Sequence, residues 1–325
     1  MPPTTRAAIP IDRELTAALR HLDLRVVRRL EGLLHGEHPG LRVGPGSEPA
    51  EARVYHPGED DIRLMDWAVT ARTTTPHVRD PVADHELESW TLLDLSASMD
   101  FGTAHQEKRE VAMGALAALT MLTQRVGDRF GVHFLHNGRI RRWPARSGKA
   151  ALITLLATIK AAPRDARPTA DTPNTTSLPE ALHDMARSHP RRGLRIIISD
   201  FLDTPPEANR DSPASWERPL RHISARHQTL AVTVSDPRET DLPAMGLVPM
   251  TDPETGKVRE VHLTPALRDT FHRAATAQRQ AIHDGLRRCG VEHIALRTDR
   301  DWVADIARFV TQQRRSVHNT PPIPR

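Results

Sequence analysis

Three oxygen-bearing side chains stand at alternate positions in the first third of this chain of 325 residues. The apolar run 90–95 has the length of a buried strand. Asp94 lies near the end of this run, and Ser96 and Ser98 follow it. Carboxylate and hydroxyl oxygens are the ligands that a hard cation such as Mg²⁺ prefers, and they suit zinc poorly. The spacing therefore predicts a site for Mg²⁺, with Mn²⁺ or Ca²⁺ as alternative ions.

Two further loops contain residues of the same chemical kind. Asp200 closely follows the apolar run 194–198, and a polar turn that includes Thr175 and Thr176 precedes a predicted helix. In an open α/β sheet, ligands bind where loops leave the carboxyl ends of the strands. We therefore expect the donors of all three loops to converge at one edge of a sheet.

Such a site would bind a partner rather than catalyse a reaction. Two carboxylates leave a divalent ion with an affinity for one more anion, and a coordination position filled by water can accept a carboxylate from another protein. The alternative is a hydrolase in which Asp94 and Asp200 hold a metal that activates water. That chemistry needs a general base, for which His183 is the only candidate near these loops, and no Gly-rich phosphate loop or nucleophile elbow is present. The prediction is a non-enzymatic protein.

Helix capping is the simpler interpretation of the same residues. Asp and Ser between a strand and a helix often accept the free backbone N–H groups of the helix. Taken alone, the segment from Asp94 to Ser98 favours capping. The Thr176 and Asp200 loops, in the right order and next to predicted elements, favour the metal site instead.

The segments that would position these residues alternate between strand-like and helix-like patterns, which predicts a parallel sheet covered by helices on both faces. The expected fold class is α/β with a central, mostly parallel sheet. Strands are expected at 90–95, 130–135, 140–143, 194–198, 230–234 and 291–296, and helices at 108–124, 148–161, 178–187, 216–227, 264–288 and 302–312.

Outside this alternation, the sequence predicts several extensions. Residues 1–38 contain an amphipathic helix, and 39–89 form a small β-rich arm broken by Gly and Pro. The main domain covers 90–313 and includes a projecting hairpin at 247–263, whose turn Asp252–Gly256 could add specificity for a partner. The Pro-rich tail 314–325 is expected to be disordered.

The order of the three loops resembles the von Willebrand factor A family, whose metal-ion-dependent adhesion site reads Asp-x-Ser-x-Ser, then a distant Thr, then a distant Asp. The resemblance implies a Rossmann-like fold and a metal site at Asp94, Ser96, Ser98, Thr176 and Asp200. Thr176 matches the family threonine better than Thr175, because it runs directly into the next helix, and both stay open. A glycine often follows the last aspartate in the family, whereas Phe201 stands here.

A narrower resemblance, to the bacterial domain-of-unknown-function family fifty-eight, extends over almost the whole chain. Its hallmarks here are Tyr55, Pro57, Gly58, Asp60, Asp61, Arg63, Asp66, Trp67, Thr70, Ala71, Arg72, Ser199, Asp200 and Phe201. The acidic and Arg residues of the arm are expected to form an internal ion-pair network. The resemblance implies an adaptor that works with a MoxR-type AAA+ ATPase in chaperone-like assembly or maturation of other proteins.

Composition limits the setting and the partners. The single cysteine excludes an internal disulfide, and neither a secretory signal nor an apolar run long enough for a membrane span is visible, so a cytoplasmic location is expected. The formal net charge is only +4 and aromatic residues make up 4% of the chain. Nucleic-acid binding through Arg-rich surfaces is therefore a weaker alternative, because it favours a concentrated basic stripe with aromatic platforms.

Overall fold

The computed structural model describes residues 52–57, 62, 65–79, 88–104, 106–123, 128–163, 176–202, 213–251 and 258–318. These residues form two units, one within Pro39–Glu86 and the other from residue 88 onward. The predicted N-terminal helix, the acidic residues Asp60 and Asp61, and the turn Asp252–Gly256 lie outside the described residues.

The smaller unit combines two short strands with a helix. Strand β1 (Ala52–Val54) pairs antiparallel with β2 (His77–Arg79), and α2 (Trp67–Thr73) lies between them in sequence. The Asp66 carboxylate accepts hydrogen bonds from the N–H groups of Ala68 and Val69, at 3.1 and 3.2 Å, and so begins α2. The arm is therefore not purely β-rich, and the aspartate expected in an ion-pair network acts as a helix cap.

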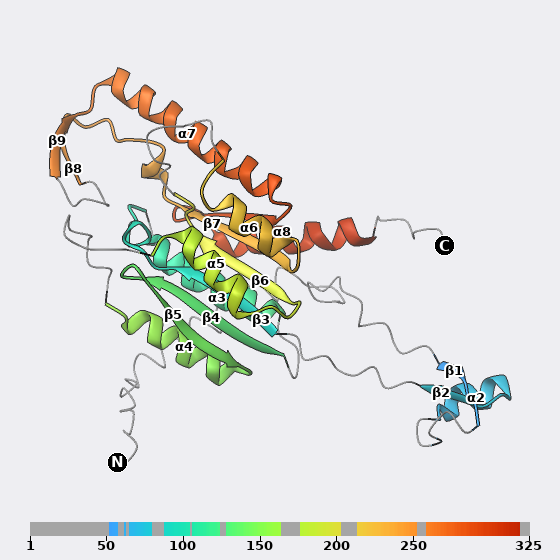
Figure 1. The fold of residues 1–325 in the computed structure, drawn as a ribbon. Helices are drawn as coiled ribbons and strands as arrows, with labels where there is room; N and C mark the ends of the chain where they lie inside the picture. The colour runs from blue at the N-terminus through green and yellow to red at the C-terminus, as the bar shows by residue number, and fades with distance from the viewer. Residues whose placement is uncertain are drawn as a thin grey trace, which may run out of the picture. The chain divides into compact units, whose positions relative to one another are not determined.

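A six-stranded sheet in the order β10–β7–β6–β3–β4–β5 forms the centre of the larger unit (Figure 1). All of its strands run parallel except β5, which pairs antiparallel with β4 at one edge. This arrangement confirms the predicted α/β fold with a mostly parallel sheet. The strands are β3 (Glu88–Asp94), β4 (Arg129–His136), β5 (Arg139–Arg146), β6 (Leu194–Ser199), β7 (Gln228–Ser235) and β10 (Glu292–Arg297).

Helices pack on both faces of this sheet, because side chains of the buried strands alternate between two apolar layers. Leu92 of β3 and Ile197 of β6 are register partners and belong to one layer, with α5 (Leu178–Ser188), α6 (Glu217–Ser224) and the end of α7 (Pro265–Arg288). The opposite layer contains α3 (Lys108–Thr123), which contacts α4 (Lys149–Ala161) and α8 (Trp302–His318). Helix α8 continues into the segment 314–325 that the sequence suggested was a disordered tail.

The β4–β5 hairpin explains the antiparallel edge, which the sequence pattern did not predict. Asn137 and Gly138 connect the two strands, and both have left-handed φ values, of 50° and 60°. This is the backbone that a two-residue hairpin turn requires, and Asn-Gly is a favoured pair for it. The short strand predicted near 140–143 is consequently a longer edge strand.

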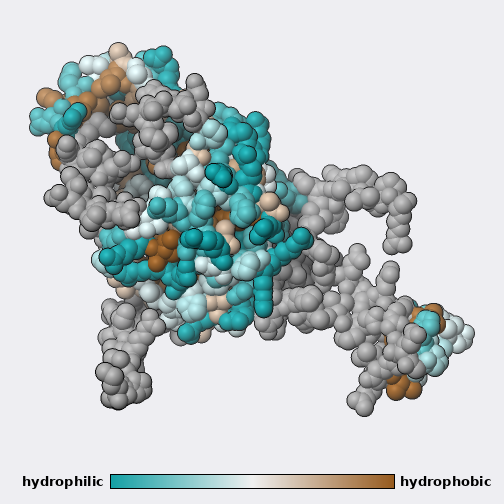
Figure 2. All heavy atoms as spheres, in the orientation of Figure 1, coloured by the Kyte–Doolittle hydropathy of each residue, from teal (hydrophilic) through white to brown (hydrophobic). Residues whose placement is uncertain are grey.

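A second hairpin, formed by two short strands, precedes α7 in the chain. Strands β8 (Leu247–Thr251) and β9 (Val258–His262) pair antiparallel. Met245, Leu247 and Val258 are each at least 60% exposed, and the hairpin appears as a partly brown region in Figure 2. Within the described residues, no helix is both long and apolar enough to cross a membrane.

Candidate metal centre

Two buried carboxylates meet at the carboxyl ends of the neighbouring parallel strands β3 and β6. Leu93 and Ile198 are register partners, so the residues that follow them, Asp94 and Ser199, lie side by side. The Ser199 hydroxyl donates to Asp94 Oδ2 at 2.7 Å. Asp94 and Asp200 are only 4% and 8% exposed, so their charges are largely removed from water.

The loop after β3 returns both serine hydroxyls toward the carboxylates. The N–H of Ser96 donates to Asp94 Oδ1 at 2.9 Å, and the hydroxyls of Ser96 and Ser98 are 3.2 Å apart. Ser98 also hydrogen bonds to Asp200, which connects the two strand ends. Four of the predicted ligand residues are therefore brought together.

Lys108, the first residue of α3, provides a cation that the sequence analysis missed. Its side chain is 1% exposed, and Nζ lies 2.8 Å from Asp200 Oδ2. The same ammonium forms a second ion pair with Glu239, in the short helix η3 (Pro237–Glu239). Arg279 of α7 in turn contacts Glu239 at 3.3 Å. Asp200 thus belongs to a chain of alternating charges that leads away from Asp94.

The two aspartates have opposite electrostatic environments. Burial, together with the charge of Asp200, raises the pKa of Asp94 from 3.8 to about 6. Burial also acts to raise the pKa of Asp200, but the Lys108 charge and hydrogen bond outweigh it and lower that pKa. Asp94 is consequently the carboxylate that has no cation of its own within the described part of the chain.

Thr176 lies at the same edge of the sheet, but on the side of β4. Its N–H donates to the carbonyl oxygen of Gly138, in the β4–β5 turn, at 2.8 Å. Ser177 and Glu180 then form a capping box that begins α5. Among the described residues, no hydrogen bond joins Thr176 to Asp94 or Asp200, and Thr175 lies outside them.

Phe201, which directly follows Asp200, has a backbone conformation that favours glycine. Its φ is 57°, in the left-handed region that residues other than glycine rarely adopt. The phenyl ring is nevertheless fully buried and packs edge-on against Trp216, with ring centroids 5.2 Å apart. Its N–H donates to the Ser199 hydroxyl at 3.0 Å. Packing of the phenyl ring therefore maintains a strained backbone at Phe201. This backbone also positions Ser199, which hydrogen bonds to Asp94.

The donor set fits a hard cation that uses hydroxyl as well as carboxylate oxygens. In the described ranges, no group of three or more His, Cys, Asp or Glu side chains is arranged to hold a metal ion. A cation at this edge would depend on Asp94, Ser96 and Ser98, with oxygen ligands only. The uncompensated Asp94 charge is what such an ion would neutralise.

His183, the candidate base of the alternative hydrolase, is directed elsewhere. Its Nδ1 contacts the carbonyl oxygen of Pro179, on its own helix, at 3.1 Å. Glu239 is held by Lys108 and Arg279. The geometry gives no positive support for catalysis.

Asp236, at the end of β7, is a second residue that the sequence analysis missed. It is wholly buried and accepts hydrogen bonds from the N–H and hydroxyl of Thr103, the hydroxyl of Thr298 and the N–H of Arg238, at 2.6–2.9 Å. Thr103 belongs to the segment that carries Ser96 and Ser98. Asp236 therefore anchors the loop that shapes the candidate site.

Comparison with known proteins agrees with the narrower resemblance. Two proteins named as uncharacterized, from Mycobacterium tuberculosis H37Rv and Mycobacterium bovis, are each 49% identical over 304 residues, which cover 94% of this chain and 91% of theirs. Among solved structures, BatB from Bacteroides thetaiotaomicron is 15% identical, with 70% of this chain and 99% of that chain covered and a TM-score of 0.39. The VWA domain of SpRpn10 is 9% identical, with 70% and 94% covered and a TM-score of 0.38.

The family assignment rests on a match that covers most of the chain. Residues 51–281 match the family described as "Protein of unknown function DUF58", which confirms the predicted membership. The match includes the arm, the Asp94 loop and the Asp200 loop. This chain belongs to the DUF58 family.

Proposed function

We propose that this chain is a non-enzymatic adaptor that binds a partner protein through a divalent cation at the carboxyl edge of its sheet. The observation that carries the proposal is the convergence of Asp94, Ser96, Ser98 and Asp200, with only Asp200 paired to an internal cation. Asp94, Ser96 and Ser98 would bind the ion directly, and Thr176 and Asp200 would complete the site. When bound, Mg²⁺ or a similar ion would offer a coordination position to a carboxylate of the partner.

Lys108 favours an acidic partner in this proposal. Because its ammonium already neutralises Asp200, Asp94 is the one negative charge left to face the ion among the described residues. A divalent ion would then keep a net positive charge and attract a carboxylate. The expected ligand of the partner is therefore an Asp or Glu side chain.

The surroundings of the site suit a protein ligand. Asp200 and Leu202 line a cavity of about 410 Å³ between the ends of β7 and β10 and the second half of α7. Phe101 and Leu202, which follow the two ligand loops, are 40% and 37% exposed. An acidic side chain flanked by apolar residues could contact both the ion and these side chains.

The partner that we propose is a MoxR-type AAA+ ATPase. This part of the proposal rests on the family resemblance, which implies an adaptor for chaperone-like assembly or maturation. The exposed Leu247 and Val258 of the β8–β9 hairpin would add specificity. Replacing both by serine is expected to weaken the complex while leaving ion binding unchanged, and an unchanged complex would remove the hairpin from the proposal.

Calorimetric titration of Mg²⁺ and Mn²⁺ tests the ion site. We expect saturable binding to the wild-type protein and to Asp299→Asn, a matched control in an exposed ion pair with Arg297. Asp94→Asn should abolish binding. Equal ion binding by all three proteins, or no ion binding by any of them, would contradict the metal site. Asp94, Ser96 and Ser98 would then be interpreted as helix caps.

The same variants test the partnership. The wild-type protein and Asp299→Asn should form a complex with the ATPase in Mg²⁺ that is lost in EDTA, and Asp94→Asn should form none. A complex that survives both EDTA and Asp94→Asn would show a partnership that does not use the ion.

A further inference from the structure

The outer edge of the sheet presents an Arg-rich strand with an unpaired side. Strand β5 pairs only with β4 among the described elements, so its other side has backbone groups that form no ladder there. Pro144 has no N–H to donate, and the register with β4 shifts beside it, so the part of this edge that can pair is 139–143. Arg139, Arg141 and Arg146 are exposed. Arg142 pairs with Asp184, and it is the one arginine of the strand with an acidic partner among the described residues. Such an edge can accept an added strand.

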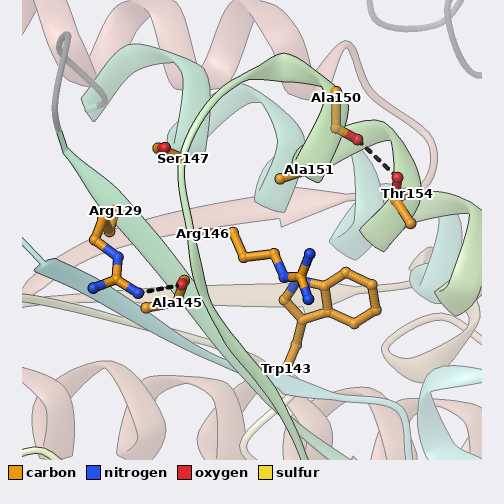
Figure 3. Close-up of a pocket in the computed structure, with 8 residues that line it drawn as sticks. All are labelled: Arg129, Trp143, Ala145, Arg146, Ser147, Ala150, Ala151 and Thr154. Atoms are coloured by element: carbon orange, nitrogen blue, oxygen red, sulfur yellow. Dashed lines mark hydrogen bonds between the residues drawn. The ribbon is translucent and has the colours of Figure 1, made fainter.

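A cavity of about 670 Å³ lies beside this edge, between the end of β5 and the first two turns of α4 (Figure 3). Two arginines, Arg129 and Arg146, are its only charged lining residues, and no acidic residue lines it. Small side chains of α4, Ala150, Ala151 and Thr154, form the opposite wall. The groove is therefore both shallow and positively charged.

Trp143 gives the groove an apolar surface. The Arg146 guanidinium carbon lies 6.0 Å from the centre of the indole ring. Figure 3 draws both side chains among those that line the pocket. The indole Nε1 is buried and has no hydrogen-bond acceptor within the described structure. Because Nε1 has no accessible surface, a ligand in the groove would contact another part of the ring and supply a carboxylate for Arg146.

We propose that this groove binds an extended, acidic segment of a partner protein, which adds as a strand along residues 139–143 of β5. The arginines deter neutral or basic strands from pairing at the edge, whereas an acidic strand gains a charge-assisted contact at alternate residues. Single-stranded nucleic acid fits less well, because it needs several stacking platforms and Trp143 is the one aromatic residue that lines this groove. This surface is separate from the carboxylates of the candidate metal centre.

Fluorescence anisotropy with labelled ten-residue peptides tests the proposal on the full chain. The acidic probe alternates Glu with Thr, a matched peptide replaces Glu by Gln, and a third has N-methyl groups on alternate residues to block strand pairing. We expect the acidic peptide to bind about tenfold or more tightly than either of the other two. An N-methylated peptide that binds equally well would overturn strand addition.

Charge reversal locates the binding surface. Arg141→Glu with Arg146→Glu should weaken binding by about tenfold or more, and Trp143→Ala should also weaken it. The control reverses Arg192 and Arg226, two exposed arginines near the amino ends of β6 and β7. Equal loss in the control would mean diffuse attraction to a basic protein, and would overturn the assignment to this groove.

Two further measurements separate this proposal from its rivals. Binding should be unchanged by EDTA and by Asp94→Asn, so it can stand or fail independently of the metal site. A labelled oligothymidylate of ten nucleotides should bind more weakly than the acidic peptide. Tighter binding of the oligonucleotide, lost with the Arg141 and Arg146 reversals, would assign the groove to nucleic acid instead.

Discussion

Asp94 and Asp236 both stand at the carboxyl end of a buried parallel strand, β3 in one case and β7 in the other. Asp236 accepts four hydrogen bonds from its own chain, and although burial acts to raise its pKa, the bonds from Thr103 and Thr298 lower it. Asp94 accepts bonds from Ser96 and Ser199 but faces Asp200, and its pKa is raised. An aspartate at the end of a buried strand can therefore be a structural anchor, or it can be a buried charge without an internal Lys or Arg to pair with.

The comparison also shows how the protein treats charge inside the site. Lys108 satisfies Asp200, while Asp94 has no such partner in the described part of the chain. Buried charges are stable only when they are paired or hydrogen bonded. A buried aspartate that receives few hydrogen bonds and no ion pair from its own chain is thus a better indication of an ion site than the presence of an aspartate alone.

Removing the ammonium should have the largest effect. We expect Lys108→Met to lower the free energy of unfolding by about 3–5 kcal/mol, because Asp200 and Glu239 are left as uncompensated buried charges. Urea unfolding in EDTA measures this, with the exposed Lys160→Met as control. A loss no larger than in the control would mean that Asp200 does not depend on Lys108.

Asp236→Ala should have the next largest effect. Its four donors would remain buried without an acceptor, so we expect a loss of about 3 kcal/mol in the free energy of unfolding. Asp299→Ala removes only an exposed ion pair and should cost no more than about 1 kcal/mol. Similar losses in the two variants would contradict the view of Asp236 as an anchor.

The stability of the metal-free protein should depend on pH through Asp94. In the unfolded chain this carboxyl ionises near 3.8, and in the folded protein near 6, so its contribution to stability declines as pH rises through this window. Asp94→Asn lacks that decline. We expect the variant to gain about 2 kcal/mol over wild type between pH 4 and pH 7 in EDTA.

Urea unfolding of both proteins at several pH values measures this difference. Carboxyls other than Asp200, which interacts with Asp94, titrate equally in the two proteins. The difference therefore reports on Asp94 together with its repulsion by Asp200. A constant difference from pH 4 to pH 7 would mean that Asp94 is not electrostatically disfavoured.

Added Mg²⁺ should have the smallest effect. At a concentration about five times its dissociation constant, a bound ion stabilises the folded state by about 1 kcal/mol. We expect this gain in wild-type protein and in Asp299→Asn at pH 7, measured by thermal unfolding, but not in Asp94→Asn. The same gain in all three would place the ion elsewhere.

The sequence predicted the residues of the site better than their interactions. Asp94, Ser96, Ser98 and Asp200 follow from their spacing and from the strand ends that carry them, and the structure brings them together. Lys108 gave no signal, because a lysine at the start of a helix is ordinary in sequence and its two acidic partners are far away along the chain. Whether Thr176 is a ligand stays a prediction.

The fold was predictable where local pattern decides it. Alternating apolar segments indicated the parallel core and the helices on both faces. The direction and full length of β5 were not evident, because exposed Arg residues interrupt its apolar pattern and its turn is only two residues long. Helix α2 was missed because its cap, Asp66, lies in a segment rich in Thr and Pro, which favours extended structure.

The left-handed backbone at Phe201 would allow substitutions distant from the proposed ion site to change its affinity. Its conformation is maintained by aromatic packing on Trp216, and the same residue orients Ser199 toward Asp94. A substitution such as Trp216→Leu would loosen that support without altering any proposed ligand. Evolution could therefore adjust how strongly the edge of the sheet holds an ion by changing the hydrophobic core, while every residue that touches the ion stays the same.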